Sequence, residues 1–203
     1  MPNKVIVTKV EATGHRLQVE FNCSGQIRKF FQLNQFIVEY NVDIEAVPEE
    51  ILIIPFLATV SPIIWANQEK LYIKTVDGMF LDSLEKVKKS LQAFYLRLTL
   101  GGMIQVKKIG NLSSSHTAKS MMLFSGGIDS LATYIRHQKE QLTLVHVISA
   151  DILQQKNGDR KTEIAEIRQF SIDHNLSFRR VSSNFMAMVD GVMLTIFDKD
   201  IAS

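Results

Sequence analysis

Hydrophobic and polar positions follow two different periods along the chain. In the first third, apolar and polar residues alternate in short runs separated by Gly14 and by Ser24-Gly25. This pattern predicts an antiparallel meander with strands at 5–12, 17–22 and 27–31. Farther along, apolar residues from 80 to 98 recur at helical spacing, and Gly101-Gly102 is expected to end that helix. Strands are predicted on either side of it, at 71–76 and 103–109.

The longest apolar run extends from Ile51 to Ala66, after a predicted helix start at Pro48. The run is shorter than the roughly 20 residues needed to cross a bilayer, and it contains Pro55 and Pro62. We therefore expect a buried segment and no membrane contact. The first fifteen residues lack the apolar core of a signal peptide, which favours a cytoplasmic protein.

The pattern changes after the polar, serine-rich stretch 111–119. Apolar runs at 121–124, 142–149 and 178–182 read as strands, and the segments 130–139 and 162–174 between them read as helices. The expected unit is β-α-β-α-β with parallel strands. The sequence thus predicts an α/β protein with an N-terminal α+β domain at 1–115 and an α/β domain at 120–203. The apolar stretch 185–197 is expected to form one further helix.

Composition narrows the class of protein. The 203 residues are 46% hydrophobic and 22% charged, as in a globular protein, and the net charge of +2 is too small to suggest a nucleic-acid-binding surface. Cys23 is the only cysteine, so an intrachain disulfide and a cysteine zinc site are excluded. It is interpreted as a small strand residue. The five histidines lack the spacing of metal ligands.

The residues with the clearest chemical meaning lie between the first strand and the first helix of the α/β unit. Two adjacent glycines, Gly126 and Gly127, allow a sharp turn that directs backbone N–H groups toward one point. The following helix N-terminus adds positive potential. Ser125 and Ser130 can donate to phosphate oxygens, whereas Asp129 beside polyphosphate makes sense where Mg²⁺ bridges the two. The loop therefore predicts a phosphate site.

The run MMLFSGGIDS at 121–130 resembles the SGGxDS loop of the N-type ATP pyrophosphatases, in the adenine-nucleotide alpha-hydrolase-like superfamily. Residues 120–183 look most like the 7-cyano-7-deazaguanine synthases and relatives with an extra N-terminal domain. The resemblance implies a Rossmann-like (HUP-type) domain that binds ATP and Mg²⁺, with Asp129 and Ser130 catalytic and Asp129 helping to hold the metal. It implies contacts to the nucleotide from residues 125–130, Ile128 included, and from Phe124, Val147 and Ser149 near the adenine.

Two features depart from that family. The four-cysteine zinc site of the synthases cannot exist here. The usual sheet has five strands, whereas only three are predicted before Asn184. We therefore expect an incomplete domain, from a fragment of a longer protein, whose first strand has an open edge unless something covers it. The N-terminal domain, a partner subunit or downstream sequence are the candidates. For Asp151, and for Arg179 and Arg180, both a nucleotide contact and a solvated role stay open.

Two functions follow from these expectations. In the first, the chain is an ATP-dependent adenylating enzyme that releases AMP and pyrophosphate while activating a carboxylate or carbonyl oxygen of a small molecule or a protein terminus. In the second, the fold binds nucleotide without catalysis, as an interaction module of a larger assembly such as an antiphage defence system. A homo-oligomer or larger complex is compatible with both.

Overall fold

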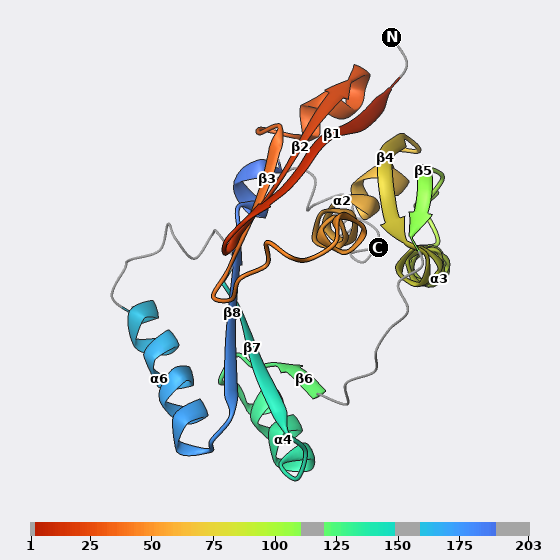
Figure 1. Cartoon of the computed structure of the whole chain (residues 1–203). Helices are drawn as coiled ribbons and strands as arrows, with labels where there is room; N and C mark the ends of the chain where they lie inside the picture. Colours follow the sequence, from red (N-terminus) through yellow and green to blue (C-terminus); the bar gives the residue numbers. More distant parts are fainter. Residues whose placement is uncertain (1–2, 111–119, 149–158, 190–203) are drawn as a thin grey trace.

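Eight strands form one mixed sheet in the computed structural model, which describes residues 3–110, 120–148 and 159–189. Their order is β5-β4-β1-β2-β3-β8-β7-β6 (Figure 1). Four neighbouring pairs are parallel and three are antiparallel. The expected α/β class is confirmed at this level. The strands are β1 (Lys4–Thr13), β2 (Arg16–Ser24), β3 (Gln35–Tyr40), β4 (Lys70–Asp77), β5 (Met103–Gly110), β6 (Ser120–Leu123), β7 (Leu142–Ile148) and β8 (Ser177–Ser183).

Helices flank this sheet in both halves of the chain (Figure 1). The best-capped one begins after Asp77, whose carboxylate accepts the N–H of Phe80 at 2.9 Å. The helical elements are η1 (Gly25–Phe30), α1 (Glu49–Leu52), α2 (Ile54–Ala66), α3 (Gly78–Phe94), α4 (Ile128–His137), α6 (Asp159–Asp173) and α7 (Phe185–Met188). No helix in these described segments is long and apolar enough to cross a membrane.

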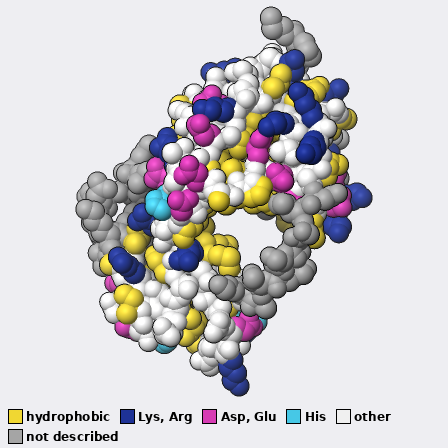
Figure 2. Space-filling model, in the orientation of Figure 1, with side chains coloured by type: hydrophobic (Ala, Val, Ile, Leu, Met, Phe, Trp, Pro, Cys, Tyr) yellow, Lys and Arg dark blue, Asp and Glu magenta, His cyan; other side chains and the backbone are white. Residues whose placement is uncertain are grey.

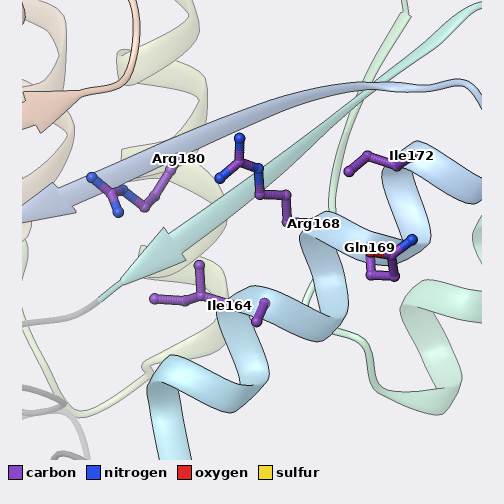
Figure 3. Close-up of a pocket in the computed structure, with 6 residues that line it drawn as sticks. Ile164, Arg168, Gln169, Ile172 and Arg180 are labelled. Carbon is purple, nitrogen blue, oxygen red and sulfur yellow. The ribbon is translucent and has the colours of Figure 1, made fainter.

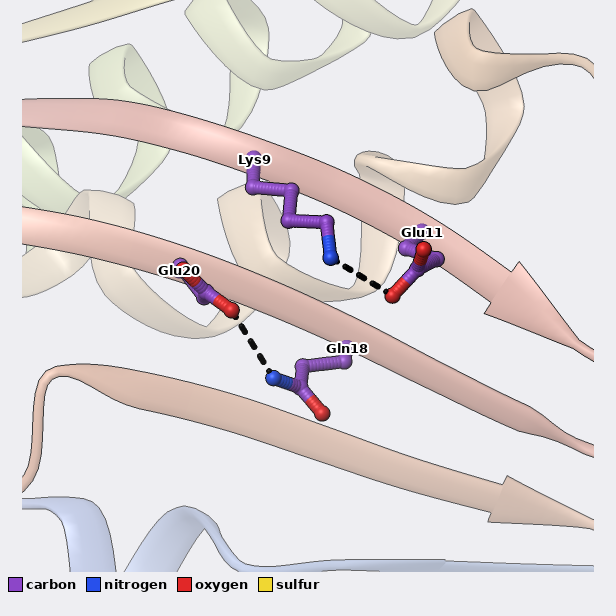
Figure 4. A network of polar contacts seen from close by, with 4 residues as sticks. All are labelled: Lys9, Glu11, Gln18 and Glu20. Atoms are coloured by element: carbon purple, nitrogen blue, oxygen red, sulfur yellow. Dashed lines mark hydrogen bonds and ion pairs between the residues drawn. The ribbon is translucent and has the colours of Figure 1, made fainter.

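The β1–β2 hairpin has one apolar face and one polar face. Side chains on the polar face interact along each strand: Lys9 pairs with Glu11 at 2.8 Å, and Gln18 donates to Glu20 at 3.0 Å (Figure 4). Leu17, Val19 and Phe21 alternate with the polar residues of β2 and are buried. This alternation is the period-2 pattern from which the hairpin was predicted.

The third strand of the meander was predicted in the wrong place. Residues 25–30 form the 3-10 helix η1, and the strand lies at Gln35–Tyr40. Ile27 and Phe30 are the buried residues of η1. Their spacing of three residues fits the three-residue turn of a 3-10 helix, because residues three apart lie on the same side.

The predicted end of α3 at Gly101-Gly102 was also wrong, since the helix ends at Phe94. The glycines instead allow a close approach to the end of α2. The N–H of Gly101 donates to the carbonyl of Trp65 at 3.0 Å, and a Cβ on Gly102 would collide with the carbonyl oxygen of Ile64. Lys88 of α3 donates to the carbonyls of both glycines.

The main hydrophobic cluster lies between α2 and strands β1–β4. The apolar run that contains α2 is buried, as predicted, with Phe56, Leu57, Val60, Ile64 and Trp65 fully enclosed. Cys23 lies half-buried on β2, which confirms its interpretation as a strand residue. Helix α2 alone therefore contributes a large share of this core.

The second half of the chain adds to the same sheet. Strands β6, β7 and β8 are parallel, as predicted, and β8 also pairs antiparallel with β3 of the meander. The meander thus extends the sheet at β8 and leaves β6 at the opposite edge. Of the three candidates for covering the first strand of the unit, the N-terminal domain does not pair with it among the described residues: its β3 pairs with β8, and β6 pairs with β7.

Hydrophobic side chains of β6 are exposed at this edge. Leu123 of β6 is 71% exposed, and Met121 on the same strand is also exposed. Figure 2 shows acidic and basic side chains interspersed over the visible part of the N-terminal half, in line with the small net charge.

The helix predicted at 185–197 begins at Phe185 as expected but ends after four residues. Helix α7 ends at Met188, and Val189 has an extended backbone and forms an isolated antiparallel bridge with Phe31. Met188 and Val189 are buried in the main cluster, which holds the chain in this conformation. Residues 190–197 lie outside the described residues, as does the predicted domain boundary at 111–119, so the division into two domains stays a prediction.

Candidate functional site

The glycine-rich loop joins the end of β6 to the start of α4. Gly126 has a φ of +78°, in the left-handed region that favours glycine. Gly127 is the N-cap residue of α4 and has no side chain to bond the first turn. The first N–H groups of a helix have no intrahelical acceptor. This end of α4 therefore presents unpaired donors and the positive end of the helix dipole to solvent.

Two hydroxyl groups meet beside these donors. The Oγ atoms of Ser125 and Ser130 lie 3.5 Å apart. Ser125 Oγ accepts the N–H of Gly127 at 3.4 Å, and Ser130 Oγ donates to the carbonyl of Gly127 at 2.9 Å. The loop thus brings together the two serines predicted from sequence, five residues apart, on one side of the turn.

Ile128 and Asp129 form the first turn of α4, and both are exposed. Ile128 is 87% exposed, which is unusual for a large apolar residue. The backbone carbonyl of Asp129 accepts the hydroxyl of Thr133 at 2.9 Å. Among the described residues, no group of three or more His, Cys, Asp or Glu could hold a metal ion. A cation at Asp129 would therefore need further ligands from a bound phosphate.

A small cluster of aromatic and aliphatic side chains packs between the loop and helix α6. Phe124 is buried, and its ring stacks on Phe170 of α6 with centroids 4.9 Å apart. Ile167 of α6 lies against the loop, with its Cγ1 3.6 Å from the position of a Cβ on Gly126. Because the Phe124 ring is buried there, only its backbone is open to a nucleotide.

His146 of β7 is a residue that sequence reasoning did not connect with the loop. It is buried, and its Nδ1 lies 3.1 Å from the carbonyl oxygen of Phe124, the residue just before the loop. The tautomer with a proton on Nδ1 donates to this carbonyl. The signal was present in the alternation of β7, which places His146 on the same face as Leu142 and Leu144.

The remaining predicted residues lie around the carboxyl ends of the parallel strands. Val147 near the end of β7 is exposed and points to the face opposite His146. Ser149 and Asp151 fall outside the described residues. Arg180 borders a groove between α6 and β8, whereas Arg179, on the other face of β8, donates to the carbonyl of Phe178 at 3.1 Å. The alternation of the strand thus separates the two arginines.

Comparison with known proteins identifies no relative of this chain. No family model matches the chain, and neither a curated protein nor a solved structure matches it.

Proposed function

We propose that the chain binds the β and γ phosphates of ATP in the loop 125–130 and acts as an adenylating enzyme. The observation that carries the proposal is the meeting of two serine hydroxyls with the exposed N-terminus of α4. Oriented N–H and O–H donors stabilise the charge that develops on departing pyrophosphate. An exposed loop at the carboxyl end of a parallel strand is also where ligands bind in open α/β sheets.

Each loop residue has a role in this proposal. Gly126 and Gly127 let the backbone approach the phosphates, and the hydroxyls of Ser125 and Ser130 donate to phosphate oxygens. Asp129 would help to hold Mg²⁺ together with the bound triphosphate, and the ion would supply positive charge that offsets the charge of the phosphates. A carboxylate or carbonyl oxygen of the substrate is the attacking group, and pyrophosphate leaves.

The parallel order of β6, β7 and β8 supports a Rossmann-like (HUP-type) domain. In this proposal β6 is the first strand of that domain, and among the described residues it lies at the edge of the sheet. The adenine would lie near the ends of β6 and β7, against the backbone of Phe124 and the exposed side chain of Val147.

A non-catalytic role in a larger assembly is the second candidate. It is favoured by the exposed apolar side chains on the edge strand and on the adjoining helix: Met121, Leu123, Leu131 and Ile135. Exposed apolar patches of this kind mark contact surfaces. In that case the loop binds nucleotide, and the edge of the sheet binds a partner or a second copy.

Pyrophosphate release from ATP separates the two functions. The full chain is incubated with Mg-ATP and a panel of carboxylates and protein termini, and AMP and pyrophosphate are quantified. We expect Asp129→Asn to abolish release and to leave some nucleotide affinity, because the hydroxyl and N–H donors remain. Asp82→Asn, an exposed aspartate on α3, is the matched control and should leave release unchanged. Nucleotide binding without any AMP would instead support the binding module.

A further inference from the structure

A groove with two arginines lies between α6 and β8, away from the glycine-rich loop. It encloses about 490 Å³ and opens beside a second hollow of about 440 Å³. Both hollows are bordered by Arg168 of α6 and Arg180 of β8, so we treat them as one groove (Figure 3). Its other lining residues include Ile164, Gln169, Ile172 and Phe178.

The two arginines border the groove from different elements. Figure 3 shows Arg168 extending from α6 toward β8, and Arg180 leaving β8 farther along the strand and pointing away from Arg168. Within the described part of the chain, neither guanidinium has a carboxylate within ion-pair distance. Nearby Asp173 accepts a hydrogen bond from Gln169 at 2.8 Å. Two uncompensated positive charges in one concavity raise the local potential and attract anions.

The backbone of Arg180 is fixed in place. Its N–H donates to Asn41 Oδ1 at 2.9 Å, and its carbonyl accepts the N–H of Asn41 at 3.2 Å. Asn41 follows β3 directly, so this contact lies at the junction between β3 and β8. A guanidinium on a fixed backbone loses less freedom when it binds a ligand than one on a mobile loop.

The rest of the groove is lined by both polar and apolar side chains, the polar ones being Asn41, Gln169 and Ser171. Of the apolar ones, Ile172 on α6 is 62% exposed, Ile164 on α6 is half-buried, and Phe178 is half-buried on β8. A guanidinium binds planar oxyanions through two parallel hydrogen bonds. We propose that this groove binds a small organic acid, with its carboxylate or phosphate group on Arg168 and Arg180 and its apolar body on the isoleucines.

This site is separate from the proposed nucleotide site and does not depend on it. Arg180 pairs with His146 on β7, and His146 contacts the carbonyl of Phe124 just before the loop. Two strand spacings, about 10 Å, therefore separate the backbones of Arg180 and Phe124. The isoleucines provide distinct probes: Ile164 and Ile172 report on the groove, and Ile128 reports on the loop.

The test uses the full chain with ¹³C-labelled isoleucine δ1 methyl groups, observed by NMR. Hexanoate and hexyl phosphate are titrated separately, with hexanol as the uncharged control and inorganic phosphate as the acid without an apolar body. We expect saturable shifts of the Ile164 and Ile172 methyls with at least one of the two acids, and no shift of Ile128. The acid that binds more tightly identifies the preferred oxyanion. Equal binding of hexanol, or no saturation by either acid up to about 10 mM, would overturn the proposal.

Substitution of the arginines gives the second part of the test. Arg168→Gln and Arg180→Gln should each weaken binding of the acid about tenfold, because each removes a charge-assisted hydrogen bond. Arg180→Lys keeps the charge without the planar donor pair and should weaken it less. Arg136→Gln, at an exposed position of α4, is the matched control and should have no effect. The same loss in Arg136→Gln would show general attraction to positive charge and would contradict the assigned site.

Discussion

The two hydrophobic clusters of the molecule differ in size and in what they support. The main cluster is rich in phenylalanine and joins β1–β4 to α2. The second is formed, among the described residues, by only five buried side chains below the glycine-rich loop: Phe124, Tyr134, Leu142, Leu144 and Ile167. We infer that the main cluster supplies most of the stability, whereas the second positions the loop.

This difference is typical of how binding sites are built. A site must expose donors and tolerate strain, and such regions belong to the less stable part of a structure. In this protein the left-handed Gly126 and the exposed serines of the loop lie over the smaller cluster, and left-handed backbone occurs in the half of the main cluster as well, at Gly14, Gly25 and Gln68. The pairing of β3 with β8 connects the two regions through the backbone of one sheet.

The largest loss of stability is expected in the main cluster. Phe56 is fully buried, with its ring centroid 5.2 Å from that of Phe21 and 5.9 Å from that of Phe36. Phe56→Ala should lower the free energy of unfolding by about 3–5 kcal/mol, measured by urea denaturation. Phe94→Ala, at a position 69% exposed, should cost less than about 1 kcal/mol. Similar losses in the two variants would contradict the burial of Phe56.

A smaller and more local loss is expected in the second cluster. Ile167→Ala should lower the opening free energy of the β7 amides by about 2 kcal/mol, because the cavity lies in a small core that can partly collapse. Hydrogen exchange resolved by strand measures this. Ile172→Ala on the same helix, at an exposed position, is the control. An equal loss of protection in the β1–β2 hairpin would show that the two regions unfold as one unit.

The next effect concerns the loop conformation. Gly126→Ala should cost about 1 kcal/mol, because the φ of +78° is unfavourable for alanine although nothing lies closer than 3.6 Å to the added Cβ. Gly127→Ala should cost less, since Gly127 has a φ of −76° and an added Cβ would make only an ordinary contact with Ser125 Oγ at 3.5 Å. Thermal unfolding of the two variants compares them. A larger loss for Gly127→Ala would contradict the turn geometry.

The last prediction needs no substitution. Burial raises the pKa of the Cys23 thiol to about 12, an effect that nearby Arg28 partly opposes. Since the thiolate is the reactive form, the folded protein should react with iodoacetamide near pH 8 roughly a thousandfold more slowly than the urea-unfolded chain. The rate should rise steadily from pH 8 to 11, as the thiolate fraction grows. A rate that levels off near pH 9 would indicate an ordinary, exposed thiol.

Local patterns in the sequence predicted much of this fold. The hairpin, the buried α2 run, the start of α3 and the three parallel strands all have a clear period or a clear turn residue. The 3-10 helix η1 was missed because Ile27 and Phe30 lie in a short apolar run that also fits a strand. The role of Gly102 was missed because a close approach between distant segments leaves no local signal.

The connection between the two halves could not be predicted from local patterns. It depends on asparagines far apart in the sequence: Asn184 Oδ1 accepts the N–H of Ile37 at 2.8 Å, and Asn41 bonds the backbone of Arg180. For the candidate site, the order of residues in SGGIDS was enough to name the two serines that lie 3.5 Å apart, and their role in phosphate binding stays a prediction. The contact from His146 and the arginine groove depend on neighbouring strands and on helix α6, so they required the structure.

The most direct test of the account is a titration of the full chain with Mg-ATP, followed by the backbone amide signals in ¹⁵N NMR. We expect the amide signals of Gly126, Gly127 and Ile128 to shift strongly and saturably, because their N–H groups donate to phosphate oxygens. Amides of the β1–β2 hairpin should not move. Saturable shifts confined to other parts of the chain, or none with the loop signals assigned, would contradict a phosphate site in this loop.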